Sequence, residues 1–102
     1  RISVGCPMTV LFRTVHVVVS GHVQGVWYRG WAVESARALD LRGWVRNRRD
    51  GTVEAVFGGP EPAIEIMLAR CHSGPPAARI DSVSVMAWDG DTGTSFYQLP
   101  TI

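Results

Sequence analysis

The chain has 102 residues, of which 46% are hydrophobic and 19% charged, and its formal net charge is +1. This length suits one domain, and this composition excludes an intrinsically disordered chain. The longest apolar stretches span a few residues, whereas a membrane span needs about 18 or more, so the sequence predicts no membrane partner. The balanced charge argues against a nucleic-acid partner, for which clustered basic residues are expected.

The N-terminal residues and the two cysteines give little information about function. We interpret residues 1–8 as a flexible leader or a cloning remnant before a single domain over residues 9–102, because the chain does not begin with Met. The apolar stretch Val10–Phe12 is too short for a secretory signal, so we expect a cytoplasmic protein. Cys6 and Cys71 are too few for a disulfide framework and lack metal-ligand spacing. We interpret them as unlinked thiols, with a bridge between them as the alternative.

The first predicted elements are a strand and a helix. The β-branched run Thr14–Ser20 predicts a buried strand, and the glycine-containing loop Gly21–Gly25 interrupts it. From about Trp27 to about Leu41 the apolar residues recur at helical spacing, and Gly43 marks the end of this helix. The apolar stripe of the helix consists of Tyr28, Ala32, Ala36 and Leu39.

A hairpin and a second helix follow. Residues 44–49 and 52–57 form the two predicted arms, and Asp50-Gly51 between them is a strong signal for a tight turn. The second helix begins near Pro62 and ends at Ser73–Pro76, where a glycine precedes two prolines. Its apolar stripe consists of Ile64, Met67, Leu68 and Cys71.

The last predicted elements are two strands. Alternating apolar residues predict a strand over residues 80–88, and a weaker strand spans residues 95–99 before Pro100. The order strand-helix-strand-strand-helix-strand predicts an α+β fold, the ferredoxin-like βαββαβ sandwich. We expect an antiparallel sheet with both helices on one face and with the first and third strands side by side.

The loop between the first strand and the first helix is a candidate anion site. The start of a helix leaves backbone N–H groups unpaired, and the helix dipole adds positive partial charge there. Arg29 lies in the first helical turn, where a cation is unfavourable unless a bound anion offsets it. Its planar guanidinium matches phosphate oxygens. A phosphate or carboxylate site is therefore one reading, and a plain connecting loop with a solvated Arg29 is the other.

Asn47 is a second candidate. Alternation along the second strand places Val45 and Asn47 on the face toward the core. An asparagine on that face needs hydrogen-bond partners, and a packing role alone would use Val or Thr. Asn47 therefore either serves a functional site or satisfies the backbone of the adjacent turn.

The remaining polar residues form no recognisable catalytic group. No nucleophile with an activating partner lies in the glycine-containing loop. We interpret His16 and His72 as structural or solvated, and no three residues have metal-ligand spacing. The arginines Arg46, Arg48 and Arg49 form either a solvated edge or a guide for a dianionic substrate.

Several segments carry a resemblance to a known family. The matching segments are Val19–Arg29, Gly43–Asn47, Asp50–Glu54, Gly59–Pro60 and Gly74–Ile80. Together they closely resemble the signature of the acylphosphatase family, in the same order and spacing, over about residues 13–88. The resemblance implies a ferredoxin-like fold. It also implies a metal-independent hydrolase that converts an acyl phosphate into a carboxylate and inorganic phosphate without a cofactor.

The resemblance also implies roles for individual residues. Arg29 corresponds to the arginine that binds the phosphate, and Asn47 to the residue that orients the attacking water. The backbone N–H groups that would cradle the phosphoryl oxygens belong to His22, Val23, Gln24, Gly25, Val26, Trp27 and Tyr28. The sequence departs from the family pattern at His22, where Arg is frequent, at the bulky pair Gly30–Trp31, and at residues 96–102, which lack a basic ending.

Two other classes of protein compete with a hydrolase. An RNA-binding sandwich needs exposed aromatic residues on its central strands, and this sequence lacks that pattern. A non-catalytic phosphate- or anion-binding module, as found in larger hydrogenase-maturation proteins, is the alternative to the enzyme. We expect a monomer that binds an acyl phosphate as substrate and inorganic phosphate or sulfate as an anion.

Overall fold

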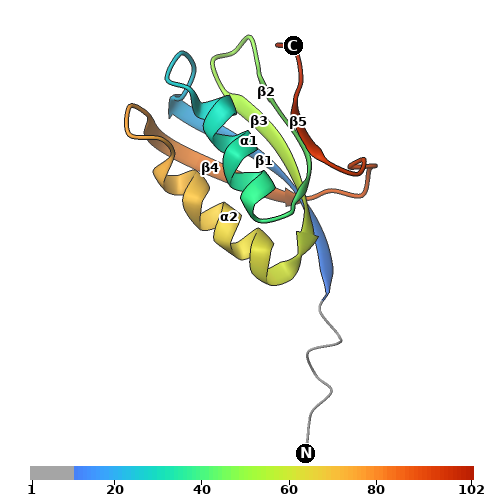
Figure 1. Cartoon of the computed structure of the whole chain (residues 1–102). Helices are drawn as coiled ribbons and strands as arrows, with labels where there is room; N and C mark the ends of the chain where they lie inside the picture. Colours follow the sequence, from blue (N-terminus) through green and yellow to red (C-terminus); the bar gives the residue numbers. More distant parts are fainter. Residues whose placement is uncertain (1–10) are drawn as a thin grey trace, which may run out of the picture.

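The structure of the protein is a computed structural model that describes residues 11–102. The leader interpreted for residues 1–8, and Cys6 with it, lies outside the described residues. Seven elements follow along the described chain (Figure 1). They are β1 (Phe12–His22), α1 (Tyr28–Ala38), β2 (Arg42–Asn47), β3 (Val53–Pro60), α2 (Glu61–Ser73), β4 (Arg79–Ala87) and β5 (Phe96–Gln98).

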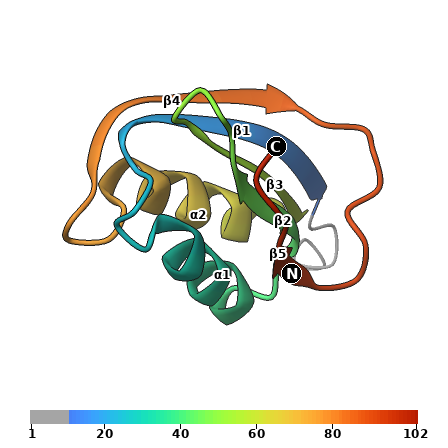
Figure 2. The ribbon, with the colours of Figure 1, turned by 90° about the horizontal axis from the view of Figure 1, so that it is seen from above.

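The strands form one sheet in the order β4-β1-β3-β2-β5. Both helices cover the same face of this sheet (Figure 2). β1 and β3 are antiparallel neighbours inside the sheet, with Val17 opposite Ala55. The expected ferredoxin-like α+β sandwich is therefore confirmed, including the pairing of the first and third strands.

The last strand corrects the expectation of a wholly antiparallel sheet. β5 pairs with β2 in parallel, with Trp44 opposite Tyr97, so the sheet is mixed. β4 lies at the opposite edge of the sheet, and its direction is antiparallel to that of β2. Trp88 follows β4 directly and stacks on His16, with 5.4 Å between the ring centroids. The connection then carries the chain across to the other edge of the sheet. The chain also reverses on the way, and β5 therefore runs in the direction of β2.

The two helices bury the predicted apolar stripes against the sheet. The fully buried helix residues are Tyr28, Ala32 and Ala36 in α1, and Ile64, Met67 and Cys71 in α2. α1 ends at Ala38, earlier than predicted, because Asp40 takes a left-handed φ of 56° and Leu41 turns into the core. The apolar stripes thus determine which face of each helix packs on the sheet. The burial of Leu41 determines where α1 ends.

The turn between β2 and β3 is closed by its own polar groups. The Arg48 N–H donates to the Thr52 carbonyl at 2.9 Å, and β2 ends at Asn47, before the predicted end of this arm. Asp50 Oδ1 accepts hydrogen bonds from the Thr52 N–H at 2.9 Å and from the Thr52 hydroxyl at 2.6 Å. These bonds hold the pKa of Asp50 below its usual range. The turn signal at Asp50-Gly51 is confirmed.

Replacing Gly43 with alanine is expected to lower the free energy of unfolding by about 2–4 kcal/mol, because strain and overpacking add there. Gly43 has a φ of +128°, and a Cβ would lie 1.9 Å from the Val56 carbonyl oxygen. Gly51→Ala is the matched control, since Gly51 has a φ of +93° with nothing within 4 Å. Urea unfolding of both variants measures the difference. Equal losses of unfolding free energy in the two variants would contradict a steric clash between residue 43 and β3.

Candidate active site

The loop after β1 and the turn after β2 lie at the same end of the sheet. Val53 of β3 pairs with Val19 on one side and with Asn47 on the other. Directly opposed residues share a face of the sheet, so Asn47 points with the buried Val19 and Val53 toward the helices. Neighbouring strands are about 4.8 Å apart, so only two strand spacings separate Asn47 from β1. The topology therefore brings Asn47 close to the loop between β1 and α1.

A cavity of about 170 Å³ lies where these segments meet. Its lining residues are Val23, Gly25, Trp27, Tyr28, Arg29, Gly30, Asn47 and Gln98. Arg29 comes from the first turn of α1, Asn47 from the end of β2, and Gln98 from β5. Arg29 forms no ion pair with any residue between 11 and 102. The cavity therefore contains an uncompensated guanidinium.

The N-terminus of α1 opens into this cavity without a side-chain cap. The N-cap residue is Trp27, which has a left-handed φ of 68°, and no side chain accepts a hydrogen bond there. The first turn of α1 contains no acidic residue. The first backbone N–H groups of a helix have no partner within the helix and carry the positive end of its dipole. Together with Arg29, they give this cavity the features of an anion site.

Asn47 has a buried polar atom without a partner. Its Oδ1 is shielded from solvent and accepts no hydrogen bond from any residue in the described range 11–102. Such an atom costs about 1–3 kcal/mol when it stays unpaired, so its presence requires an explanation. The adjacent turn does not supply one, because Asp50 closes that turn. The reading of Asn47 as a local turn residue is therefore not supported.

Gln24 joins the loop to the β2–β3 turn. Its Nε2 donates to the Arg48 carbonyl at 2.7 Å and to the Thr52 carbonyl at 2.8 Å. Both amide protons are used, and both acceptors lie just beyond the strand ends that flank the turn. These two bonds fix the distance between the loop and Asn47. The resemblance predicted only a backbone contribution from Gln24, so this side-chain role is a finding of the structure.

The structure brings together most of the residues predicted for the site. Arg29, Asn47 and the loop residues Val23, Gly25, Trp27 and Tyr28 line one cavity. His22, Gln24 and Val26 do not line it. His22 instead ends β1 opposite Arg79 and is exposed.

Two lining residues, Gly30 and Gln98, were missed by sequence reasoning. Gln98 belongs to a strand of three residues with a weak pattern. In the sequence, Gly30 stood out only as part of the pair Gly30–Trp31, which departs from the family pattern.

Tyr28 and Cys71 are structural partners under the cavity. The Tyr28 hydroxyl donates to the Cys71 carbonyl at 3.0 Å, and burial raises the pKa of Tyr28 well above its usual value. Burial also raises the pKa of the Cys71 thiol to about 11. Cys71 carries a free thiol, as interpreted from the sequence. Both groups are therefore neutral at physiological pH.

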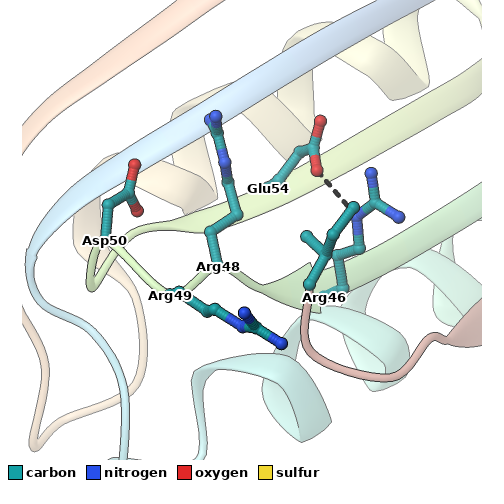
Figure 3. Close-up of a pocket in the computed structure, with 6 residues that line it drawn as sticks. Arg46, Arg48, Arg49, Asp50 and Glu54 are labelled. Carbon is teal, nitrogen blue, oxygen red and sulfur yellow. Dashed lines mark hydrogen bonds and ion pairs between the residues drawn. The ribbon is translucent and has the colours of Figure 1, made fainter.

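The three arginines around Asn47 are not equivalent (Figure 3). Arg46 Nε donates to Glu54 Oε1 at 2.7 Å, and Glu54 Oε2 lies 2.7 Å from His16 Nε2. Burial acts to raise the pKa of Glu54, but the bonds to His16 and Arg46 outweigh it and lower that pKa. Arg48 and Arg49 form no ion pair with any residue of the described chain. Of the three, only Arg48 and Arg49 therefore carry a charge without a carboxylate partner among the described residues.

Two further features are absent from the described residues. Between residues 11 and 102, no three His, Cys, Asp or Glu side chains lie close enough together to hold a metal ion. No helix in this range is long and apolar enough to span a membrane.

Comparisons with known proteins match this arrangement. The family model described as Acylphosphatase matches residues 15–97. An acylphosphatase from Rhodospirillum rubrum is 54% identical over 90 residues, which cover 88% of this chain and 99% of that protein.

Solved structures agree. An acylphosphatase from Coxiella burnetii superposes with a TM-score of 0.83 at 34% identity, covering 86% of this chain and 93% of that one. HypF from T. kodakarensis superposes with a TM-score of 0.74 at 33% identity, covering 84% of this chain but 11% of that one. Since the family model and near full-length relatives match most of the described residues, this chain belongs to the acylphosphatase family.

Proposed function

We propose that this protein hydrolyses acyl phosphates to a carboxylate and inorganic phosphate without a metal ion. One observation supports this most directly: a single cavity joins the uncapped N-terminus of α1 and the unpaired Arg29 to the buried, unpartnered Oδ1 of Asn47. The first two features suit a phosphoryl group, and the side-chain amide of Asn47, which lines the same cavity, suits a water molecule beside it.

The phosphoryl group binds at the start of α1 in this proposal. The backbone N–H groups of the loop and of the first helical turn donate to the phosphoryl oxygens, and Arg29 contacts two of these oxygens through its planar fork. Phosphoryl transfer needs positioning and charge stabilisation more than covalent chemistry by the protein. The loop donors and Arg29 are already in place before the substrate arrives, so they stabilise charge without reorganising.

Asn47 positions the nucleophile. Its side-chain amide holds a water molecule and aims the water oxygen at phosphorus, opposite the acyl oxygen. The new P–O bond forms as the bond from phosphorus to the acyl oxygen breaks. The acyl oxygen leaves as a carboxylate, and both protons of the water end on the phosphate, which leaves as H₂PO₄⁻. A carboxylate is a good leaving group, so no strong general base is required.

A phosphate-binding module without catalysis is the second candidate. The match to HypF favours it, because there the similar region forms 11% of a much longer chain. The near full-length match to an acylphosphatase favours the enzyme. We further propose a cytoplasmic location, with no nucleic-acid or membrane partner, in keeping with the small net charge and the short apolar stretches.

Hydrolysis of benzoyl phosphate at neutral pH in the presence of EDTA tests the proposal. We expect turnover that EDTA does not change, because the site uses backbone N–H groups and a guanidinium in place of a metal. Circular dichroism verifies the fold of the sample. Absence of turnover by the folded protein would contradict the enzyme, and phosphate binding by calorimetry would then support the module.

Gln24→Glu is expected to lower kcat/KM by about tenfold or more, since small displacements of a positioned group have effects of this size. The carboxylate cannot donate to the Arg48 and Thr52 carbonyls, and it repels them. Gln24→Met keeps the shape, loses both bonds and should fall between wild type and Gln24→Glu. Full activity in Gln24→Met would contradict a positioning role.

A further inference from the structure

We propose that Trp27 is a platform for the acyl group of the substrate and makes the enzyme prefer aromatic acyl phosphates to small aliphatic ones. This inference rests on the proposed function, because it concerns the part of the substrate that lies outside the phosphoryl cavity. It starts from the size of that cavity. Pockets that enclose a whole ligand measure about 300–1,000 Å³, and this one measures about 170 Å³. The cavity therefore suits the phosphoryl group, and the acyl group extends over its rim.

Trp27 forms the apolar part of this rim. Its side chain is 58% exposed although it lines the cavity together with Arg29 and Asn47. The other aromatic lining residue, Tyr28, is buried and bonded to Cys71. An acyl group attached to a phosphoryl group between Arg29 and Asn47 thus meets one exposed aromatic face.

The indole of Trp27 is held over the first turn of α1. A Cβ at Gly30 would lie 2.1 Å from Trp27 Nε1 and 2.7 Å from Cδ1 and Cε2. The ring therefore occupies the space that Gly30 leaves by lacking a side chain. A larger residue at position 30 would therefore displace the indole.

The backbone of Trp27 supports the same conclusion. Its φ of 68° is left-handed, a conformation that costs a bulky residue about 1–2 kcal/mol and that Asn or Gly adopts more easily. Burial does not offset this cost, because most of the side chain is exposed. Backbone strain of this kind collects at functional sites. A role in contacting the substrate explains an exposed tryptophan in a strained conformation, whereas a role in packing does not.

Two non-hydrolysable analogues test the platform directly. Phenacylphosphonate and acetonylphosphonate carry a methylene in place of the bridging oxygen and differ in having an aromatic or a methyl group. We expect wild type to bind phenacylphosphonate more tightly, and Trp27→Asn to reduce this preference about fivefold to tenfold through loss of stacking. Asn is chosen because it tolerates a left-handed φ. Trp27→Phe should keep most of the preference.

Two further variants separate the platform from general effects. Phe12→Asn removes an aromatic side chain that is 56% exposed and lies outside the cavity, so it should leave the preference unchanged. Gly30→Ala displaces the indole while improving helix propensity, so it should reduce the preference without lowering the melting temperature.

Kinetics extend the test to the reaction. The ratio of kcat/KM for benzoyl phosphate over acetyl phosphate should fall in Trp27→Asn about as far as the binding ratio, with the inhibition constant of inorganic phosphate unchanged. An unchanged binding ratio in Trp27→Asn would overturn the platform whether or not the protein is an enzyme. Failure of wild type to hydrolyse either substrate would contradict the proposed function alone, because the analogues still report on Trp27.

Discussion

Replacing Arg29 with alanine is expected to lower kcat/KM for benzoyl phosphate at least about 10²–10³-fold, the usual effect of removing one preorganised donor to a developing charge. Arg29 lines the cavity and has no ion-pair partner among residues 11–102. Its charge is therefore available to a phosphoryl group. In the proposed mechanism Arg29 contacts the group in both the ground state and the transition state, so both KM and kcat should change.

The free energy of unfolding of Arg29→Ala should stay the same or rise, although its activity falls. Arg29 lies at the positive end of the α1 dipole, where a cation costs about 0.3–1 kcal/mol in the absence of an anion. Alanine removes this repulsion and is the better helix former. Urea unfolding in a phosphate-free buffer should therefore show Arg29→Ala to be as stable as wild type or more stable. Added phosphate should stabilise wild type and leave Arg29→Ala nearly unchanged.

Two controls make this result specific. Arg70→Ala removes an exposed arginine near the end of α2, outside the cavity, and should leave kcat/KM unchanged. Arg29→Lys keeps the charge but loses the planar fork, so it should recover a small part of the activity. An Arg29→Ala variant that is folded, binds phosphate normally and retains activity would contradict the assignment of this cavity as the phosphoryl site.

The fold was predictable because its signals are local. Apolar residues at helical spacing, such as Ala32 with Ala36 and Ile64 with Met67, identified both helix faces. The glycine turn at Gly51 identified the hairpin. Given the order of elements, right-handed crossovers leave one arrangement of the first four strands. The direction of β5 was not predictable in this way, because a long connection after Trp88 can reach either edge of the sheet.

The candidate site was predictable only in part. Arg29 and Asn47 meet because β1 and β2 run in the same direction on either side of β3, which follows from the strand order. The double hydrogen bond of Gln24 and the contact of Trp27 with Gly30 depend on side-chain conformations. No spacing in the sequence encodes these conformations, so residues that shape the site through them emerge only in the structure.

Replacing Asn47 with alanine is expected to lower kcat about 10²-fold or more, the size of effect that follows when a reacting group is no longer positioned. KM and the inhibition constant of phosphate should change little, because in the proposed mechanism Asn47 contacts the water and not the phosphoryl group. This separation of kcat from binding distinguishes Asn47 from Arg29. Steady-state kinetics with benzoyl phosphate, and inhibition by inorganic phosphate, measure both quantities.

The stability of the same variant tests the reason for the unpaired atom. Asn47 Oδ1 is buried and accepts no hydrogen bond from residues 11–102, so alanine removes an unpaired acceptor that costs about 1–3 kcal/mol. Asn47→Ala should therefore lose most of its activity without losing stability. Asn47→Asp keeps an acceptor for the water but adds a negative charge beside a dianionic substrate, so it should weaken phosphate binding as well. A variant Asn47→Ala that unfolds more easily and retains kcat would show instead that Asn47 is structural. A stable variant with a low kcat would support the placement of the attacking water beside the Asn47 side chain, where the end of β2 meets the loop before α1.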